Sequence, residues 1–533
     1  MAEVEPLPWK TFPELLRALR ERDDDGEALV DGEMRLGFSA LHDAAREVAR
    51  ALQARGVGAG DRVAIWASNG WRWVVTACGV WECGAVLVPL ASRWKPPEVA
   101  PLLARSGARW LFAQERAAGE ELLPALAAHC GVGGPGRPLA GIDELEGIVV
   151  LDTACAEPGA AETWTDFLAA GEGTRLAPPP AAPEGLAQIL FTSGTTGAPK
   201  GVELRQRQLL QSYWDWSGIG GLQEGDRFLV IPPYSHGFGI NGGILACLLR
   251  GVTNVPMAVF SPEAALEIIA REKISIISGP PTLFATLMNL PDFDPDALES
   301  LRVAFVGAAN VPTEIIHRMR ERMGIERVCN AYGLIETCVI SMTRADDPLE
   351  IVSTTTGRPL PGVEVRIVDP EGAELGAEAP GEIEVRGDGI MSGYWRDPEQ
   401  SAATLNAEGW ARTGDLGSVD GAGHVRILDR LKDAYNCGGF SAYPAEIENQ
   451  LLERAELAQV AVVGVPDERL GEVGCAFVVA VEGCNVEPAE LIAWARENMA
   501  NYKVPRRVFV LDALPLNANG KVRKSELRAR VTG

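Results

Sequence analysis

The chain has 533 residues, more than one compact domain usually holds, so two or more domains are expected. Hydrophobic residues make up 47% and charged residues 23%, as is typical of a soluble globular protein. The formal net charge of −24 excludes a general binder of nucleic acid or of anionic membranes, because its long-range field repels both.

The N-terminal segment and the cysteines indicate a cytoplasmic protein. Residues 1–6, MAEVEP, lack the basic-then-apolar order of a signal peptide. No stretch approaches the roughly 20 uncharged apolar residues that span a bilayer. The ten cysteines are scattered without metal-ligand spacing, and Cys247, Cys329 and Cys475 lie in apolar runs typical of reduced core thiols. We therefore expect a cytoplasmic location and no stable membrane insertion.

Strand and helix patterns alternate through the first part of the chain. Strands are expected at residues 62–66, 85–90, 110–113 and 147–151, among helical patterns such as Phe38–Gln53. A Pro/Ala/Gly-rich link at 177–185 precedes a second block. In that block strands are expected at 227–232, 274–278 and 303–306, and helices at 262–271 and 312–323. This order predicts an α/β fold, a large N-terminal domain of mostly parallel β-α sheets.

The pattern of expected strands and helices changes from about Gly362. Short alternating strands at 363–368, 381–386 and 424–428, broken by Gly and Pro, predict a small antiparallel β unit. A helix–strand pattern then follows at residues 444–454, 457–463, 475–481, 488–499 and 507–511. We expect an N-terminal domain over 1–430 and an α+β C-terminal domain over 431–533, joined by a short linker near 429–433.

A segment rich in small and hydroxyl side chains follows the strand-like run Gln188–Phe191. It reads TSGTTGAPKG over residues 192–201. Small residues let backbone N–H groups turn toward a phosphate, hydroxyls add donors, and a mobile lysine adds charge. It is not a Walker A loop, because Gly201 follows Lys200 where that loop has Ser or Thr. A formal G-x-G-x-x-G match at 131–136 follows a helical stretch and contains Pro135, so it is a surface loop.

Four further motifs follow in order: NAYGLIE at 330–336, WARTGD at 410–415, DRLKD at 429–433 and NGK at 519–521. Together with residues 192–201 they resemble the adenylate-forming superfamily of acyl-CoA synthetases, peptide-synthetase adenylation domains and luciferases. Each motif alone is modest, whereas five in the family's order are not expected by chance. The resemblance implies a large N-terminal domain, a small mobile C-terminal domain and an active site between them.

The resemblance implies a set of contacts to ATP and AMP. The residues that would grip the β- and γ-phosphates are Thr192, Ser193, Gly194, Thr195, Thr196 and Lys200. The adenine and ribose site would comprise Gly307, Ala308, Ala309, Asn330, Ala331, Tyr332, Gly333, Asp415 and Arg430. Tyr332 would stack on adenine, Asn330 would bond its amino group, and Asp415 would accept both ribose hydroxyls.

The resemblance also implies the catalytic, metal, acyl and CoA residues. Lys521 would bridge the substrate carboxylate and the α-phosphate as charge builds there, and Glu336 with Thr192 would hold Mg²⁺. The acyl pocket, gated by His236, would comprise His236, Phe238, Gly239, Gly242, Gly307, Gly333 and Leu334. Its glycines either leave room for a bulky acid or serve helix–sheet packing. Lys432 would be the hinge, and Cys437, Gly438 and Gly439 would line the pantetheine tunnel.

Two positions depart from the family pattern. Ile335 stands where the family usually has a Thr whose hydroxyl reaches the AMP phosphate. One neutral hydrogen bond to a charged group contributes roughly 1.5–3 kcal/mol, so adenylation is expected to be about tenfold to a hundredfold slower unless another group compensates. Asp429 replaces the usual Gly at the head of the hinge motif.

The implied reaction is the activation of a carboxylic acid as its acyl-adenylate, followed by transfer to CoA. ATP, Mg²⁺ and coenzyme A are therefore the expected cofactors. Alternatives are an acyl-AMP ligase that serves a separate carrier protein, a medium-chain or aryl acid CoA ligase, and a non-catalytic acyl-nucleotide binder. Residues 66–73 and 235–257 resemble bacterial CoA ligases of steroid breakdown, including the indane-propionate type, which implies a bulky polycyclic acid. No nucleic-acid partner is expected, and a homodimer is the candidate oligomer.

Overall fold

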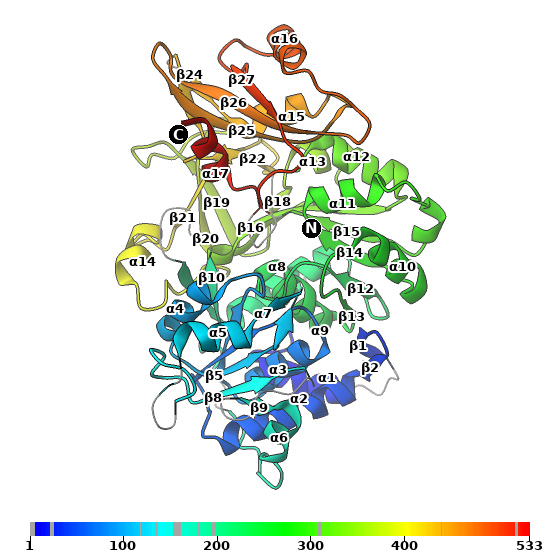
Figure 1. The fold of residues 1–533 in the computed structure, drawn as a ribbon, viewed down its shortest axis with the longest axis vertical. Coiled ribbons are helices and arrows are strands. Elements are labelled where there is room, and N and C mark those ends of the chain that lie inside the picture. Colours follow the sequence, from blue (N-terminus) through cyan, green and yellow to red (C-terminus); the bar gives the residue numbers. More distant parts are fainter. Residues whose placement is uncertain are drawn as a thin grey trace.

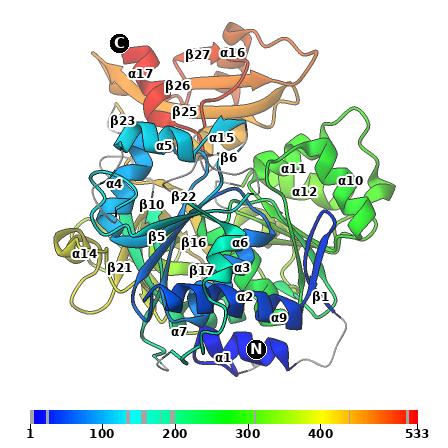
Figure 2. The same ribbon diagram turned by 60° about the horizontal axis from the view of Figure 1, so that its bottom comes forward.

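A computed structural model describes residues 6–21, 26–117, 119–131, 133, 137–152, 161–179, 182–192, 199–307, 311–438, 440–516 and 521–532. Seven predicted site residues lie outside this described part of the chain: Ser193, Gly194, Thr195, Thr196, Ala308, Ala309 and Gly439. The rest of the chain folds into a large domain and a smaller C-terminal domain, which is drawn in orange and red in Figures 1 and 2.

A seven-stranded sheet holds the first block of strands in the order β11-β10-β4-β3-β5-β8-β9. Its strands are β3 (Arg62–Trp66), β4 (Val86–Leu90), β5 (Ala108–Ala113), β8 (Gly147–Val150), β9 (Glu162–Thr163), β10 (Leu186–Thr192) and β11 (Lys200–Arg205). Neighbours from β10 to β9 run parallel, as predicted, whereas β11 returns antiparallel to β10. The inner strands β4 and β8 are buried along their whole length, as expected where helices cover both faces of a sheet.

A nine-stranded sheet holds the second block in the order β18-β17-β16-β15-β14-β12-β13-β1-β2. Its strands are β1 (Glu27–Asp31), β2 (Met34–Gly37), β12 (Arg227–Val230), β13 (Thr253–Pro256), β14 (Ile276–Gly279), β15 (Val303–Val306), β16 (Arg327–Leu334), β17 (Cys338–Met342) and β18 (Arg358–Pro359). The strands from β1 to β16 are parallel, and β2, β17 and β18 are antiparallel. The segment Asn330–Glu336 thus turns from the end of a parallel strand into an antiparallel hairpin.

The two large sheets enclose the main core. Residues of both sheets share this core with the helices α1 (Phe12–Arg20), α2 (Phe38–Ala54), α3 (Trp71–Glu82), α7 (Gln206–Gly220) and α9 (Ala246–Arg250). Separate outer cores lie under α4 (Pro96–Ser106) and α5 (Leu123–Cys130), and under α10 (Pro262–Glu272), α11 (Pro281–Met288) and α12 (Thr313–Arg322). The result is a layered α-β-α-β-α arrangement.

The small β unit is a four-stranded antiparallel sheet, as predicted. It contains β19 (Val363–Val368), β20 (Gly381–Gly387), β21 (Ala411–Val419) and β22 (Val425–Arg430). The motif Trp410–Asp415 runs from just before β21 into that strand, which the sequence pattern did not predict. A short helix, α14 (Pro398–Thr404), connects β20 to β21.

The C-terminal domain has a core of its own, built from residues between Tyr435 and Leu527. Its five-stranded sheet contains β23 (Tyr435–Cys437), β24 (Phe440–Ala442), β25 (Leu457–Asp467), β26 (Gly471–Ala480) and β27 (Arg507–Val510). Three helices accompany the sheet: α15 (Pro444–Leu451), α16 (Pro488–Asn498) and α17 (Lys524–Thr532). In Figure 2 this domain lies above both halves of the large domain. Over the described part of the chain, no helix is long and apolar enough to cross a bilayer.

Candidate active site

A cleft of about 2700 Å³ lies between the large domain and the C-terminal domain. Its walls come from the ends of β15 and β16, from β21 and β22, from α7, and from α15 and the start of α17. Lys200, Arg430, Lys432 and Lys521 line it. In a chain with a net charge of −24, such a collection of cations in one cleft indicates a local site for an anion.

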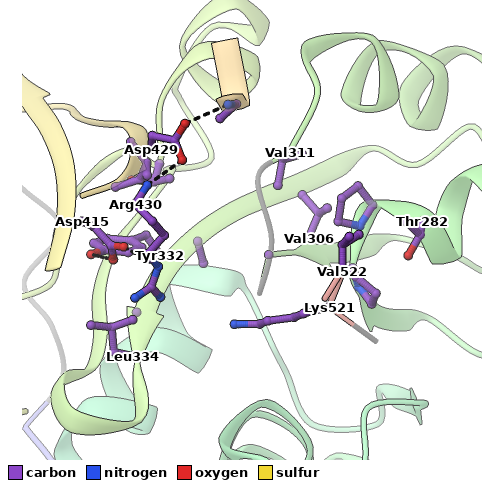
Figure 3. Close-up of a pocket in the computed structure, with 18 of the residues that line it drawn as sticks. Thr282, Val306, Val311, Tyr332, Leu334, Asp415, Asp429, Arg430, Lys521 and Val522 are labelled. Carbon is purple, nitrogen blue, oxygen red and sulfur yellow. Dashed lines mark hydrogen bonds and ion pairs between the residues drawn. The ribbon is translucent and has the colours of Figure 1, made fainter. Parts of the chain in front are cut away.

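Lys521 enters the cleft from the C-terminal domain. Its amino group points toward the strand that carries Tyr332 and Leu334 (Figure 3). Desolvation in the cleft and the positive charge of Arg430 lower the pKa of Lys521, while Asp415 and Glu336 act in the opposite direction. Lys521 therefore lies within electrostatic reach of both carboxylates that the sequence motifs contribute.

Asp415 joins Tyr332 and Arg430 at one side of the cleft. Tyr332 Oη donates to Asp415 Oδ2 at 2.5 Å, and Arg430 Nε lies 2.6 Å from Asp415 Oδ1. Asp415 and Arg430 face each other across β21 and β22, so the sheet register holds the pair. Asp415 is only 2% exposed, and this burial raises its pKa, although Arg430 and Tyr332 lower it. The side chain presents a fixed carboxylate beside an aromatic ring.

Asn330 carries an unused hydrogen-bond acceptor at the bottom of the cleft. Its Nδ2 donates to the carbonyl oxygens of Val352 and Thr355 at 3.2 and 3.0 Å. Its Oδ1 is buried and has no partner in the described part of the chain. A buried acceptor without a partner is costly unless a ligand supplies a donor. Gly307 lies on the adjacent strand end, where a Cβ would come within 2.8 Å of the carbonyl oxygen of Ala331.

Thr192 and Lys200 face each other where β10 ends and β11 begins. The hairpin brings both residues to the cleft, where Lys200 Nζ donates to Gln400 Oε1 at 2.6 Å and lies 4.9 Å from the ring centre of Tyr394. Tyr394 Oη in turn donates to Glu336 Oε1 at 2.9 Å. A hydroxyl, an ammonium and a carboxylate thus meet at one edge of the cleft.

His236 lies at the entrance to an apolar part of the cleft. The backbone N–H of Phe238 donates to His236 Nδ1 at 3.2 Å, so the neutral ring carries its proton on Nε2. Burial and the charge of Lys521 lower the pKa of His236 to about 4. The apolar part, here called the acyl pocket, is lined by Leu190, Tyr213, Trp216, Phe238, Leu334 and Cys338. His236 therefore stands between the pocket and Lys521 as an uncharged group.

The glycines of residues 237–243 differ in what they face. A Cβ on Gly237 would have no atom closer than 3.9 Å, whereas one on Gly242 would lie 3.1 Å from the Phe238 ring. A Cβ on Gly239 would lie 2.1 Å from the carbonyl oxygen of Pro233, and one on Gly243 would lie 2.6 Å from Val230. In contrast to the prediction, Gly239 therefore serves backbone packing and does not form the pocket wall.

The predicted CoA segment lies away from the cleft. Cys437 ends β23 with its side chain buried in the C-terminal core, and Gly438 follows with a positive φ of 62°. Neither residue lines the cleft that Lys521 enters. In this arrangement of the two domains, Lys521 and the Cys437–Gly438 turn are not brought together.

Comparison with protein-family models matches the description "AMP-binding enzyme" to residues 16–395, and "AMP-binding enzyme C-terminal domain" to residues 446–521. The chain belongs to the AMP-binding enzyme family. The first match covers the two large sheets, and the second lies within the C-terminal domain. Family membership agrees with the resemblance that the five sequence motifs carry.

Curated relatives and solved structures match over nearly the whole chain. A 3-[(3aS,4S,7aS)-7a-methyl-1,5-dioxo-octahydro-1H-inden-4-yl]propanoyl:CoA ligase of Mycobacterium tuberculosis is 43% identical over 97% of this chain and 98% of its own length. The ligase of the same name from Rhodococcus jostii is 41% identical, with 98% of each chain covered. The crystal structure of the anthranilate CoA ligase AuaEII in complex with anthranoyl-AMP superposes with a TM-score of 0.87 at 25% identity and covers 98% of both chains.

Several residues of the cleft carry no motif signal. Tyr394 and Gln400 contact Glu336 and Lys200 across long sequence separations, and Tyr213 contributes to the acyl pocket from α7. A local pattern could not reveal these residues, because tertiary contacts alone place them at the site.

Proposed function

We propose that this protein is an ATP-dependent carboxylic acid:CoA ligase that forms an acyl-AMP intermediate. The observation that carries the proposal is the meeting of Lys521 with Asp415, Arg430 and the unpartnered Asn330 Oδ1 in one cleft. An adenine amino group would donate to Asn330 Oδ1, the Tyr332 ring would stack on the base, and Asp415 would accept from the ribose hydroxyls. These groups suit an adenine nucleotide whose α-phosphate points toward Lys521.

In the proposed first step, a carboxylate oxygen of the acid attacks the α-phosphorus of ATP. The bond to the β-phosphate breaks, and pyrophosphate leaves. Lys521 would neutralise the charge that builds on the carboxylate and the α-phosphate, and Lys200 would hold the departing phosphates. Desolvation, together with the positive charges of Arg430 and Lys432, lowers the pKa of Lys521, and a bound polyanion would favour its charged form.

Magnesium would be held by Glu336 and Thr192 together with the phosphates. Both residues line the cleft, and carboxylate and hydroxyl oxygens are ligands that Mg²⁺ accepts. Two protein oxygens fit an ion that keeps most of its shell for water and phosphate. When bound, the ion supplies charge neutralisation for the phosphates.

In the proposed second step, the thiolate of CoA attacks the acyl carbonyl and AMP leaves. Lys521 occupies the cleft in the present arrangement, so we infer that the C-terminal domain rotates at Lys432 to admit the thiol. This rotation would place the domain boundary at residues 430 and 431. Cys437, Gly438 and Gly439 would then line the path of the pantetheine arm. The exposed Gly438, with its positive φ, suits close approach of a thin ligand.

The substrate proposed is a bicyclic keto acid of the kind that the two ligases named above act on. Identities of 41–43% over nearly full length and an acyl pocket walled by Leu190, Trp216 and Phe238 support this substrate class.

A cytoplasmic location and a homodimer stay predictions.

A pyrophosphate-release assay with CoA tests the proposal on indane-propionate, aryl, medium-chain and terpenoid acids. We expect acid-dependent release and the largest kcat/KM with the indane-propionate acid. Release only when a carrier protein replaces CoA would support a carrier-protein ligase instead. A higher kcat/KM with aryl or medium-chain acids would overturn the substrate class. If the protein binds ATP but catalyses no ATP–pyrophosphate exchange with any of the acids, it would be a non-catalytic binder.

A further inference from the structure

One wall of the acyl pocket holds three buried polar side chains from three different elements. Gln188 lies on β10 and is 0% exposed, Tyr213 lies on α7 and is 7% exposed, and Asn241 lies in the helical segment after His236 and is 1% exposed. Tyr213 and Asn241 line the cleft. Burying polar groups in an apolar pocket costs free energy unless they are hydrogen-bonded. Their presence in this wall therefore indicates that they form hydrogen bonds with each other or with a ligand.

Gln188 and Asn241 are joined by a hydrogen bond, and Asn241 lies beside Tyr213. Gln188 Nε2 donates to Asn241 Oδ1 at 2.9 Å, which turns the Asn241 amide nitrogen toward Tyr213. Burial raises the pKa of the Tyr213 hydroxyl, and the hydrogen bond from Asn241 acts against this rise. We infer that the Asn241 amide donates to Tyr213 Oη, which leaves the Tyr213 proton for another acceptor. In the described part of the chain, no side chain or carbonyl accepts that proton.

A π-helix positions Asn241. Residues Ile240–Leu245 form a π-helical segment. Its backbone hydrogen bonds join residues five apart, whereas those of an α-helix join residues four apart. Such segments are rare and occur frequently at functional sites. Here the wider turn places Asn241 opposite Gln188 and Tyr213, on the pocket side of the helix.

The space in front of the Tyr213 hydroxyl is open and otherwise apolar. A Cβ on Gly237 would lie 3.9 Å from Tyr213 Oη and 4.0 Å from Asn241 Nδ2, with no closer neighbour than 3.9 Å. Leu190, Trp216 and Cys338 line the same pocket, and burial raises the pKa of Cys338 to about 12, so its thiol stays neutral. The pocket thus offers one oriented O–H donor in apolar surroundings.

We propose that Tyr213, oriented by Asn241 and Gln188, donates a hydrogen bond to a carbonyl oxygen on the ring system of the acyl substrate. Tyr213 is then a specificity-determining residue, and Asn241 and Gln188 are positioning residues. A ring ketone fits this donor because it accepts a hydrogen bond and has no proton to give. The inference rests on the proposed function and narrows its substrate to acids that carry such an acceptor away from the carboxyl group.

The test uses the indane-propionic acid with both ring ketones and its 1-deoxo and 5-deoxo analogues, in which a methylene replaces one ketone. The kcat/KM for pyrophosphate release is measured for each acid with the wild-type enzyme and with Tyr213→Phe, which removes only the hydroxyl. Tyr234→Phe is the matched control. It removes a second buried tyrosine hydroxyl, which donates to Asn254 and lies outside the cleft lining.

We expect the wild-type enzyme to favour the diketone over one of the deoxo analogues by roughly tenfold, and Tyr213→Phe to remove that preference. Tyr234→Phe should keep it. Equal kcat/KM values for all three acids in the wild-type enzyme, or an unchanged preference in Tyr213→Phe, would overturn the inference while leaving the ligase assignment intact. Failure of every acid to release pyrophosphate would instead count against the proposed function.

Discussion

The Asp429 carboxylate joins the large domain to the first turn of α15 in the C-terminal domain. Asp429 Oδ2 accepts a hydrogen bond from the backbone N–H of Ala445 at 2.9 Å, and Oδ1 accepts from the N–H of Arg430 at 2.7 Å. Asp429 precedes Lys432 in the chain and Ala445 follows it. The proposed rotation at Lys432 would therefore break this contact, so we infer that Asp429, at the head of the hinge motif, acts as a conformational latch.

Asp429→Ala is expected to weaken the present arrangement of the domains. Loss of a side chain that caps a helix N-terminus costs about 1 kcal/mol, which shifts a two-state equilibrium roughly fivefold. Fluorescence energy transfer between labels on the two domains measures the shift. Asp429→Asn, which keeps an acceptor oxygen, is the control. An unchanged transfer efficiency in Asp429→Ala would show that the latch does not govern the domain arrangement.

The latch is also expected to depend on pH. Burial raises the pKa of Asp429 to about 6. The charge of Lys524 lowers this pKa, and the charge of Glu448 raises it. A carboxyl whose pKa is raised in the folded state contributes stability at low pH, and this contribution is lost as pH rises through about 6. The melting temperature of the wild-type protein should therefore fall, relative to Asp429→Asn, between about pH 4 and pH 6.5 and change little above that range. A constant difference in melting temperature between the two proteins over this range would contradict a raised pKa at Asp429.

Lys521→Ala is expected to separate the two half-reactions. The variant removes the cation that faces Asp415 and Glu336 across the cleft, so adenylate formation should fall to background. Thioester formation from supplied acyl-AMP and CoA should stay within about twofold of wild type, because the proposed domain rotation takes Lys521 out of the site in that step. ATP–pyrophosphate exchange and thioester assays measure the two steps. An equal loss of both would contradict the domain rotation.

Ile335→Thr is expected to raise the rate of adenylation. Ile335 begins the 3₁₀ turn that carries Glu336, lines the cleft and packs against the main core. A hydroxyl there can donate to the AMP phosphate and recover part of the roughly tenfold to hundredfold deficit expected from its absence. Ile335→Val, similar in shape but without a hydroxyl, is the control. Equal exchange rates in both variants would mean that another donor already serves the phosphate.

Much of the fold was predictable from sequence because both large sheets are covered on both faces. Strands such as Arg62–Trp66 and Val303–Val306 are continuously apolar, and their boundaries match the predicted ones. Helix α17 was not predicted, because Lys524–Thr532 alternates charged and small residues without an apolar stripe. Strand β11 was missed because it follows the glycine-rich segment that suggested a loop.

The same reason explains which residues of the site could be predicted from sequence. Motif residues such as Asn330 and Asp415 meet in the cleft because each lies on a strand whose register is fixed by its sheet. Gly239 was misassigned because the use of a glycine depends on what an added Cβ would meet, here the carbonyl oxygen of Pro233. Asn241 was missed because its direction follows from a π-helix, a geometry with no sequence period.

His236 is expected to act as an uncharged group throughout the working pH range. Burial and Lys521 lower its pKa to about 4, so the folded protein binds no proton there between pH 4 and pH 6.5, whereas the unfolded chain does. Its contribution to stability is therefore lost as pH falls from 6.5 toward 4. His236→Phe keeps an aromatic ring at the pocket entrance, so the wild-type to variant ratio of exchange rates should stay constant from pH 6 to pH 8. A ratio that changes near pH 6.5 would mean that His236 titrates in the open cleft, and that its charge takes part in adenylation.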